Sequence, residues 1–112
     1  MKEKTTVKNN YEFRRLYQKG KSALDKNLVL YVRPNRRGQN RVGLTVSSKL
    51  GCAVVRNRVR RRLREIFRLN NVHVAQGFDF ILVARSHAVE CSYKELERSY
   101  RKLQQTLKLW EA

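Results

Sequence analysis

The segment from Ala53 to Leu69 constrains the fold of this chain more than any other part of its sequence. Its apolar residues recur at intervals of four, four and three positions, and they are Val55, Val59, Leu63 and Ile66. This spacing is the period of an amphipathic helix, which must bury that stripe against a core. The same segment contains seven arginines, so the fold must also leave one side of the helix exposed.

The arginines of this helix form the first predicted binding site. At about 100° per residue they fall mainly on an arc opposite the apolar stripe. Like charges four residues apart, such as Arg60 and Arg64, cost roughly 0.2 to 0.5 kcal/mol per pair, and only Arg61 and Glu65 are clearly complementary. Guanidinium groups make bidentate contacts with phosphate, and the dipole at a helix N-terminus favours anions. The residues predicted to contact a polyanion are Arg56, Asn57, Arg58, Arg60, Arg61, Arg62, Arg64 and Arg68.

The overall charge supports a polyanionic partner. The chain has 26 Lys and Arg against 9 Asp and Glu, which gives a formal net charge of +17. A free globular protein gains nothing from such self-repulsion. A membrane is a poorer candidate, because no apolar run approaches the roughly 20 residues that a span requires and residues 1–10 lack a signal-peptide stretch. We therefore expect a soluble, cytoplasmic RNA-binding protein with no obligate protein partner.

The order of the remaining elements predicts an α+β fold. With 112 residues, 41% of them hydrophobic, the chain can form one modest core, so residues 1–112 are taken as a single domain with residues 1–8 as a flexible basic arm. We expect a helix between Asn9 and Gly20, strands at Leu28–Arg33, Arg41–Ser47 and Phe78–Ala84, and a last helix from the capping pair Ser92 and Glu95 to about Leu109. This α-β-β-α-β-α order predicts a two-layer sandwich with a small sheet.

The aromatic residues of the first helix suggest a second site. Phe13 and Tyr17 lie one turn apart, and unpaired bases commonly stack on such rings. Core packing is the more ordinary explanation of the same spacing. Tyr31 and Arg33 fall on the mixed face of the predicted sheet and would extend the surface. A cleft for single-stranded RNA is therefore a hypothesis at this stage.

Catalytic patterns are absent from the sequence. There is no His-Glu-x-x-His segment, no paired carboxylates on one face and no glycine-rich phosphate loop. His73 and His87 are isolated and are interpreted as surface or structural residues. Cys52 and Cys91 have no metal-ligand spacing and are interpreted as free, small buried side chains. We expect no catalytic residue in this chain and no metal requirement of the isolated protein.

The central run of the sequence resembles the bacterial ribonuclease P protein family. Residues 41–64 read RVGLTVSSKLGCAVVRNRVRRRLR, and the Arg-Asn-Arg at positions 56–58 is similar to the hallmark of that family. The resemblance extends to the first helix at Glu12–Tyr17 and to the strands at Leu28–Tyr31 and Asp79–Arg85. Two departures are Tyr17, where the family often has Phe, and Cys52, which stands at a variable position.

The resemblance implies a function and a mechanism. The arginine-rich helix would bind the catalytic RNA, and a cleft would hold the single-stranded 5′ leader of precursor tRNA. The RNA, with Mg²⁺ bound mainly to it, would remove the leader and give tRNA with a 5′ phosphate. The resemblance also implies a left-handed crossover between parallel strands, against the usual right-handed rule. The leader-binding residues expected from the resemblance and from the sheet pattern are Phe13, Tyr17, Val29, Tyr31 and Arg33.

Three other functions remain compatible with the composition. A structured-RNA scaffold protein of the ribosomal type would share the charge without binding a leader. A nuclease with its own active site is disfavoured by the scarcity of grouped acidic residues. A DNA-binding helix is disfavoured because no helix-turn-helix pair or dimer seam is evident.

Overall fold

The computed structural model describes residues 10–111, except for the side chains at positions 10–13 and 15. The predicted flexible arm, residues 1–8, lies outside this part. The elements in chain order are α1 (Asn10–Lys19), β1 (Lys21–Leu24), β2 (Leu28–Pro34), β3 (Arg41–Thr45), the 3₁₀ turn η1 (Ser48–Leu50), α2 (Ala53–Asn70), the 3₁₀ turn η2 (Asn71–His73), β4 (Phe78–Ala84), α3 (His87–Glu90) and α4 (Tyr93–Thr106).

The four strands form one mixed sheet in the order β1-β2-β4-β3. β1 pairs with β2 and β2 pairs with β4, both antiparallel, whereas β3 and β4 are parallel. β4 is an interior strand, as its apolar sequence predicted, and Phe80, Ile81 and Leu82 are fully buried. The two central strands of the sheet, β2 and β4, are therefore distant in sequence.

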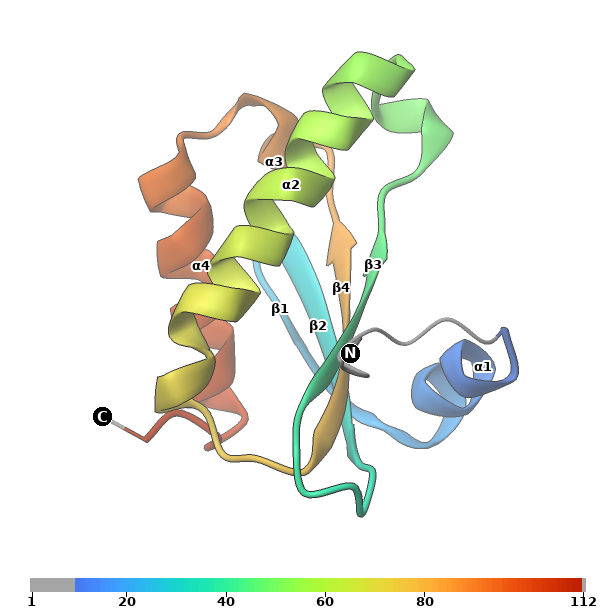
Figure 1. Ribbon diagram of the computed structural model, residues 1–112. Helices are drawn as coiled ribbons and strands as arrows, with labels where there is room; N and C mark the ends of the chain where they lie inside the picture. The colour runs from blue at the N-terminus through green and yellow to red at the C-terminus, as the bar shows by residue number, and fades with distance from the viewer. Residues whose placement is uncertain (1–9, 112) are drawn as a thin grey trace, which may run out of the picture.

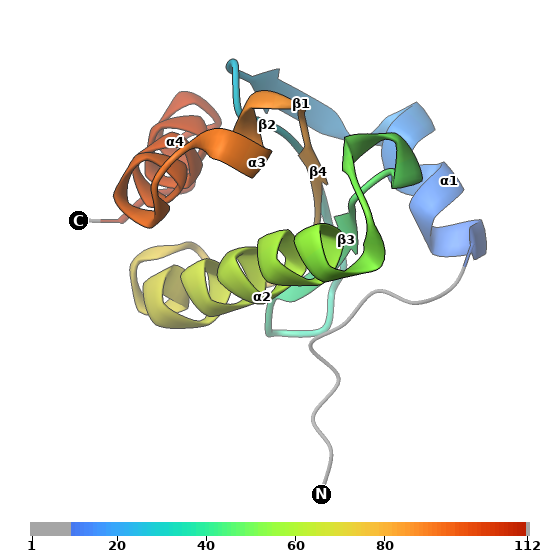
Figure 2. The same cartoon turned by 90° about the horizontal axis from the view of Figure 1, so that it is seen from above.

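The helix α2 connects the two parallel strands by a left-handed crossover. In Figure 1 the sheet is seen nearly edge-on, β3 and β4 both run upward and α2 lies mainly to their left; Figure 2 shows that β4 lies behind β3 in the view of Figure 1, so from the side of α2 the second strand is to the left of the first. A right-handed connection would place the second strand to the right when the helix is in front. The hand expected from the resemblance is thus confirmed.

Helices cover both faces of the sheet, as Figure 2 shows from above. α2 and α4 lie on one face, where Leu63 and Leu96 pack with Leu30 and Leu82 in the main core. α1 lies on the other face, where Leu16 packs on Ile81. The predicted α+β class is confirmed, and α1 adds a partial third layer to the expected two.

The structure corrects several of the predicted elements and ends β3 at Thr45 rather than at Ser47. It adds the strand β1 and the short helix α3, which the sequence pattern did not indicate, and it ends α4 at Thr106 rather than near Leu109. The predicted cap at Ser92 is present, since its hydroxyl accepts a hydrogen bond from the Glu95 backbone N–H at 3.1 Å. The reciprocal half of the capping box does not form, because the Glu95 carboxylate accepts from the Asn27 side chain instead.

Candidate RNA interface

The helix α2 presents its arginines to solvent, as its period predicted. Val59, Leu63, Ile66 and Phe67 are buried beneath the helix. Most of the polar residues on the other side are exposed or half-buried. We call this group the arginine surface, and it consists of Asn57, Arg58, Arg60, Arg61, Arg64 and Arg68.

Several members of this surface keep their charge uncompensated. Within residues 10–111, Arg58, Arg61 and Arg64 make no hydrogen bond or ion pair. The predicted Arg61 to Glu65 pair does not form, because the Glu65 carboxylate lies 3.4 Å from the Arg68 guanidinium. Both members of that pair are exposed, so it contributes little to stability. The surface therefore stays strongly positive.

Two of the eight predicted contact residues donate to backbone carbonyl groups of the protein itself. The Arg56 side chain donates to the Gly51 carbonyl at 3.1 Å, and Arg62 donates to the Cys91 carbonyl at 3.2 Å. Arg62 therefore faces the junction between α3 and α4 rather than the arginine surface. A third contact orders the surface, since Arg60 donates to the Asn57 side-chain oxygen at 2.8 Å.

The start of α2 carries no acidic residue to offset its dipole. Cys52 occupies the N-cap position, and its side chain makes no capping hydrogen bond. Cys52 is exposed, which corrects the prediction that both cysteines are buried, while Cys91 is buried. The backbone N–H groups of Val55 and Val54 lower the pKa of the Cys52 thiol, because they stabilise its thiolate. The end of the helix that contains Arg56 and Arg58 is thus electropositive.

The second predicted site lies on the face of the sheet that α1 covers. The rings of Tyr17 and Tyr31 meet edge to face, with centroids 4.8 Å apart at 86°. The Tyr17 hydroxyl lies 3.4 Å from the Thr45 hydroxyl, and Tyr17 remains 43% exposed. The structure therefore brings Tyr17 and Tyr31 together. The side chain of Phe13, predicted for the same site, lies outside the described residues.

Strand register assembles the rest of this face into three rows. The rows are Leu24, Val29, Val83 and Thr45; then Ser22, Tyr31, Ile81 and Gly43; then Arg33, Asp79 and Arg41. Leu24 is 61% exposed, and Val29 and Val83 are half-buried. We call the accessible part the α1-side face, and it consists of Tyr17, Leu24, Val29, Tyr31, Arg33 and Val83. Sequence reasoning missed Leu24 because β1 was not recognised, and it treated Val83 only as core.

A buried ion pair fixes one end of the α1-side face. Arg41 donates to both carboxylate oxygens of Asp79, at 2.8 and 2.6 Å, and Asn35 donates to the same carboxylate at 2.7 Å. Burial alone would raise the pKa of Asp79, but the hydrogen bonds from Arg41 and Asn35 outweigh it and lower the pKa. Arg41 is therefore committed to the fold, while the neighbouring Arg33 stays half exposed.

The described residues do not assemble a metal-binding cluster. Between positions 10 and 111, no three His, Cys, Asp or Glu side chains lie together in a way that could hold a metal ion. His73 packs against Trp110, with ring centroids 5.1 Å apart. His87 is less isolated than predicted, since its Nδ1 lies 2.5 Å from the Asn27 side-chain oxygen and 3.9 Å from the Glu95 carboxylate. In the same part of the chain, no helix combines the length and apolarity of a membrane span.

These features define a class of protein. A small, strongly basic α+β chain uses a left-handed crossover helix to present arginines, and it keeps an aromatic sheet face beside a separate helix. Such a combination fits contact with a structured polyanion that also has unpaired bases.

Comparisons with known proteins identify the family. The sequence profile described as Ribonuclease P matches residues 1–108. The Ribonuclease P protein component of Natranaerobius thermophilus is 45% identical over 109 residues, which cover 97% of this chain and 95% of that protein. The one from Caldanaerobacter subterraneus subsp. tengcongensis is 43% identical over 112 residues, with 99% and 97% covered. The chain belongs to the ribonuclease P protein family.

Solved structures agree with this assignment. The RNase P protein of Staphylococcus aureus superimposes with a TM-score of 0.88 at 31% identity, covering 97% of this chain and all of that one (100%). The RNase P protein of Thermotoga maritima superimposes with a TM-score of 0.83 at 26% identity, covering 90% and 96%. The likeness therefore extends over the whole fold, including the crossover.

Proposed function

We propose that this protein, as the protein subunit of ribonuclease P, binds the ribonuclease P RNA through the arginine surface. We propose further that its α1-side face holds the single-stranded 5′ leader of precursor tRNA. The observation that carries the first part is the row of arginines on α2, of which Arg58, Arg61 and Arg64 have no partner within residues 10–111. Phosphate groups of a folded RNA would supply the missing partners.

The α1-side face suits an unpaired strand. Tyr17 is partly exposed above Tyr31, and Leu24, Val29 and Val83 offer apolar surface beside it. Stacking of a base on an aromatic ring contributes roughly 1 to 3 kcal/mol and does not depend on the base. Leaders differ in sequence from one precursor to another, so a surface that reads few base edges would accept them all.

We assign the hydrolytic step to the RNA and to Mg²⁺ bound mainly by it. Residues 10–111 offer no set of grouped carboxylates or histidines that fits a protein-held metal ion. The contribution of this chain would be electrostatic, because its arginines neutralise phosphates that otherwise repel the substrate. Less Mg²⁺ would then be needed to bring precursor and catalytic RNA together.

The experiment that tests this proposal is cleavage of a precursor tRNA at low Mg²⁺. Three reactions are compared: a bacterial ribonuclease P RNA with the protein, the same RNA alone, and the protein alone. We expect strong stimulation only in the combined reaction, with release of a 5′-phosphate tRNA. Cleavage by the protein alone would place an active site in this chain and contradict the assignment of chemistry to the RNA.

A binding measurement on the assembled holoenzyme separates leader binding from a scaffold role. Two precursors that differ only in leader length, one nucleotide against about ten, are compared for affinity to the assembled holoenzyme. A leader held on the α1-side face predicts tighter binding of the longer one, with stacking worth roughly 1 to 3 kcal/mol per base. Equal affinities, together with stimulation of cleavage, would leave only the structured-RNA scaffold function.

A further inference from the structure

The helix α4 carries a second cationic surface that its sequence conceals. Along the chain, four basic and two acidic residues are interspersed on this helix, a pattern typical of a solubilising face. In the structure the basic residues Lys94, Arg98, Arg101 and Lys102 are all exposed. The two acids, Glu95 and Glu97, are only half exposed.

Both acids bind residues that lie outside α4. The Glu97 carboxylate accepts a hydrogen bond from the Asn70 side chain of α2 at 2.9 Å. The Glu95 carboxylate lies 3.4 Å from the Asn27 amide and 3.4 Å from the Lys26 ammonium. Within residues 10–111, neither acid forms an ion pair with a basic residue of α4, although Glu97 and Arg101 have favourable i,i+4 spacing.

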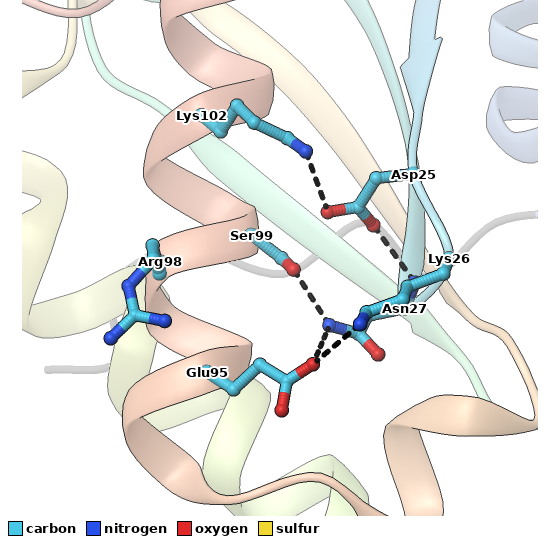
Figure 3. Close-up of a pocket in the computed structure, with 7 residues that line it drawn as sticks. All are labelled: Asp25, Lys26, Asn27, Glu95, Arg98, Ser99 and Lys102. Carbon is cyan, nitrogen blue, oxygen red and sulfur yellow. Dashed lines mark hydrogen bonds and ion pairs between the residues drawn. The ribbon is translucent and has the colours of Figure 1, made fainter.

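A hollow of about 500 Å³ lies between α4 and the turn that joins β1 to β2. Its lining includes Lys26, Arg98 and Lys102, and Figure 3 shows the Arg98 side chain pointing away from the hydrogen-bonded groups. The other carboxylate in the hollow, Asp25, accepts from the backbone N–H groups of Asn27 and Leu28 and pairs with Lys102 at 3.7 Å. Both carboxylates of the hollow are thus satisfied internally.

The remaining charge on this face is positive and poorly compensated. Lys94 and Arg98 make no hydrogen bond or ion pair within the described residues, and they are like charges four positions apart. Arg101 lies over the Trp110 ring, with the guanidinium carbon 5.2 Å from the ring centroid, which fixes the side chain while it stays exposed. On a face that is only solvated, the acids would be expected to pair with the neighbouring cations of α4 rather than with residues of other elements.

We infer that this face of α4, formed by Lys26, Lys94, Arg98, Arg101 and Lys102, is a second binding site for RNA phosphate groups. It is separate from the arginine surface, because the hydrogen bond from Asn70 of α2 to Glu97 of α4 lies between the two helices. The helices lie side by side on one face of the sheet, as Figure 2 shows. The protein could therefore contact two RNA segments at once, which goes beyond the proposed function.

The test is the salt dependence of RNA binding by the double variant Lys94→Gln, Arg98→Gln. Neither residue makes a hydrogen bond or ion pair within the described chain, so the variant should fold, which its thermal unfolding checks. Each lost phosphate contact lowers the log-log salt slope by about 0.7 to 0.9, so the expected decrease is roughly 1.5. The titrations use ribonuclease P RNA alone and then precursor tRNA added to the assembled holoenzyme.

Two controls separate a local contact from a change in overall charge. The swap Lys94→Arg, Arg98→Lys keeps both charges and should keep the slope. The pair Lys19→Gln, Lys108→Gln removes two exposed cations outside this face. A larger loss for the α4 variant in the first titration assigns the face to ribonuclease P RNA, and a larger loss only in the second assigns it to the substrate. Slopes equal to those of the Lys19 and Lys108 variant in both titrations would overturn the inference.

Discussion

The arginine surface and the α1-side face are built in opposite ways. The arginine surface comes from one helix, so successive turns of α2 supply it and the core beneath needs only the apolar stripe. The α1-side face takes Tyr17 from α1, Leu24 from β1, Tyr31 from β2 and Val83 from β4. Those residues meet only because the strands pair in one register. Charge on a helix can therefore change residue by residue, whereas the composite face depends on the integrity of the sheet.

The buried ion pair at the end of the α1-side face is one contact on which the integrity of the sheet depends. Arg41 and Asp79 come from neighbouring parallel strands, and both are buried. The arginine surface contains no comparable buried charge. Substitutions of the ion pair at the α1-side face should accordingly lower stability, whereas substitutions in the arginine surface should weaken binding.

The largest effect is expected from Asp79→Ala. Removing the carboxylate leaves the Arg41 charge buried without its main partner, which typically costs about 3 to 5 kcal/mol of unfolding free energy. Urea unfolding at pH 7 measures this loss. The exposed acid Glu90 provides the matched control, because Glu90→Ala should change stability by less than about 0.5 kcal/mol. A cost below about 1 kcal/mol for Asp79→Ala would mean that the pair does not hold this face together.

The stability that the Arg41–Asp79 pair contributes should depend on pH. The folded chain lowers the pKa of Asp79 below the unfolded value. Its stabilisation is therefore fully present above the unfolded pKa and is lost as the pH falls through the folded pKa. The wild-type protein should lose stability below about pH 4, and Asp79→Asn should lose less over the same interval.

An intermediate effect is expected at Tyr17. The ring is partly exposed and is held by Tyr31, so Tyr17→Ala should weaken binding of a single-stranded RNA by roughly 1 to 3 kcal/mol. Tyr17→Phe keeps the ring and should keep most of the affinity. Fluorescence anisotropy with a labelled leader oligonucleotide measures both variants on the assembled holoenzyme. Unchanged binding by Tyr17→Ala would remove this residue from the leader site.

The smallest effects distinguish two arginines one position apart on α2. Arg62 donates to the Cys91 carbonyl, so Arg62→Gln should cost about 1 kcal/mol of stability. Arg61 has no partner within residues 10–111, so Arg61→Gln should leave stability within about 0.5 kcal/mol. Its effect should appear instead as a decrease of about 0.7 to 0.9 in the salt slope of RNA binding. The opposite result for the two variants would reverse the roles assigned to them.

Local pattern predicted the elements whose signal is long and periodic. α2 was expected at Ala53–Leu69 and is found at Ala53–Asn70, because apolar residues that recur over about three turns fit only the helical period. β4 was predicted with the observed bounds, since a run that is apolar on both sides fits an interior strand. β1 was missed, because its four residues are mostly exposed and only pairing with β2 makes them a strand.

The direction of individual charged side chains could not be read from the sequence. Arg41 falls on the same side of its strand as Thr45, yet it is buried because Asp79 of β4 lies beside it. Glu95 was expected to complete a capping box, but Asn27 and Lys26, distant in sequence, provide its partners. Each outcome depends on what lies across the fold, which spacing along the chain does not encode.

The sequence by itself determined the strong positive charge of the protein and the helical period of α2, and from these it predicted a polyanionic partner, because net charge and helical period are properties of the chain alone. It also carried enough of its family's pattern to predict the α+β class and the crossover. Only the tertiary structure decided which charges remain available. Buried partners neutralise some of them and leave others free, and that selection requires segments far apart in sequence to lie within hydrogen-bonding distance.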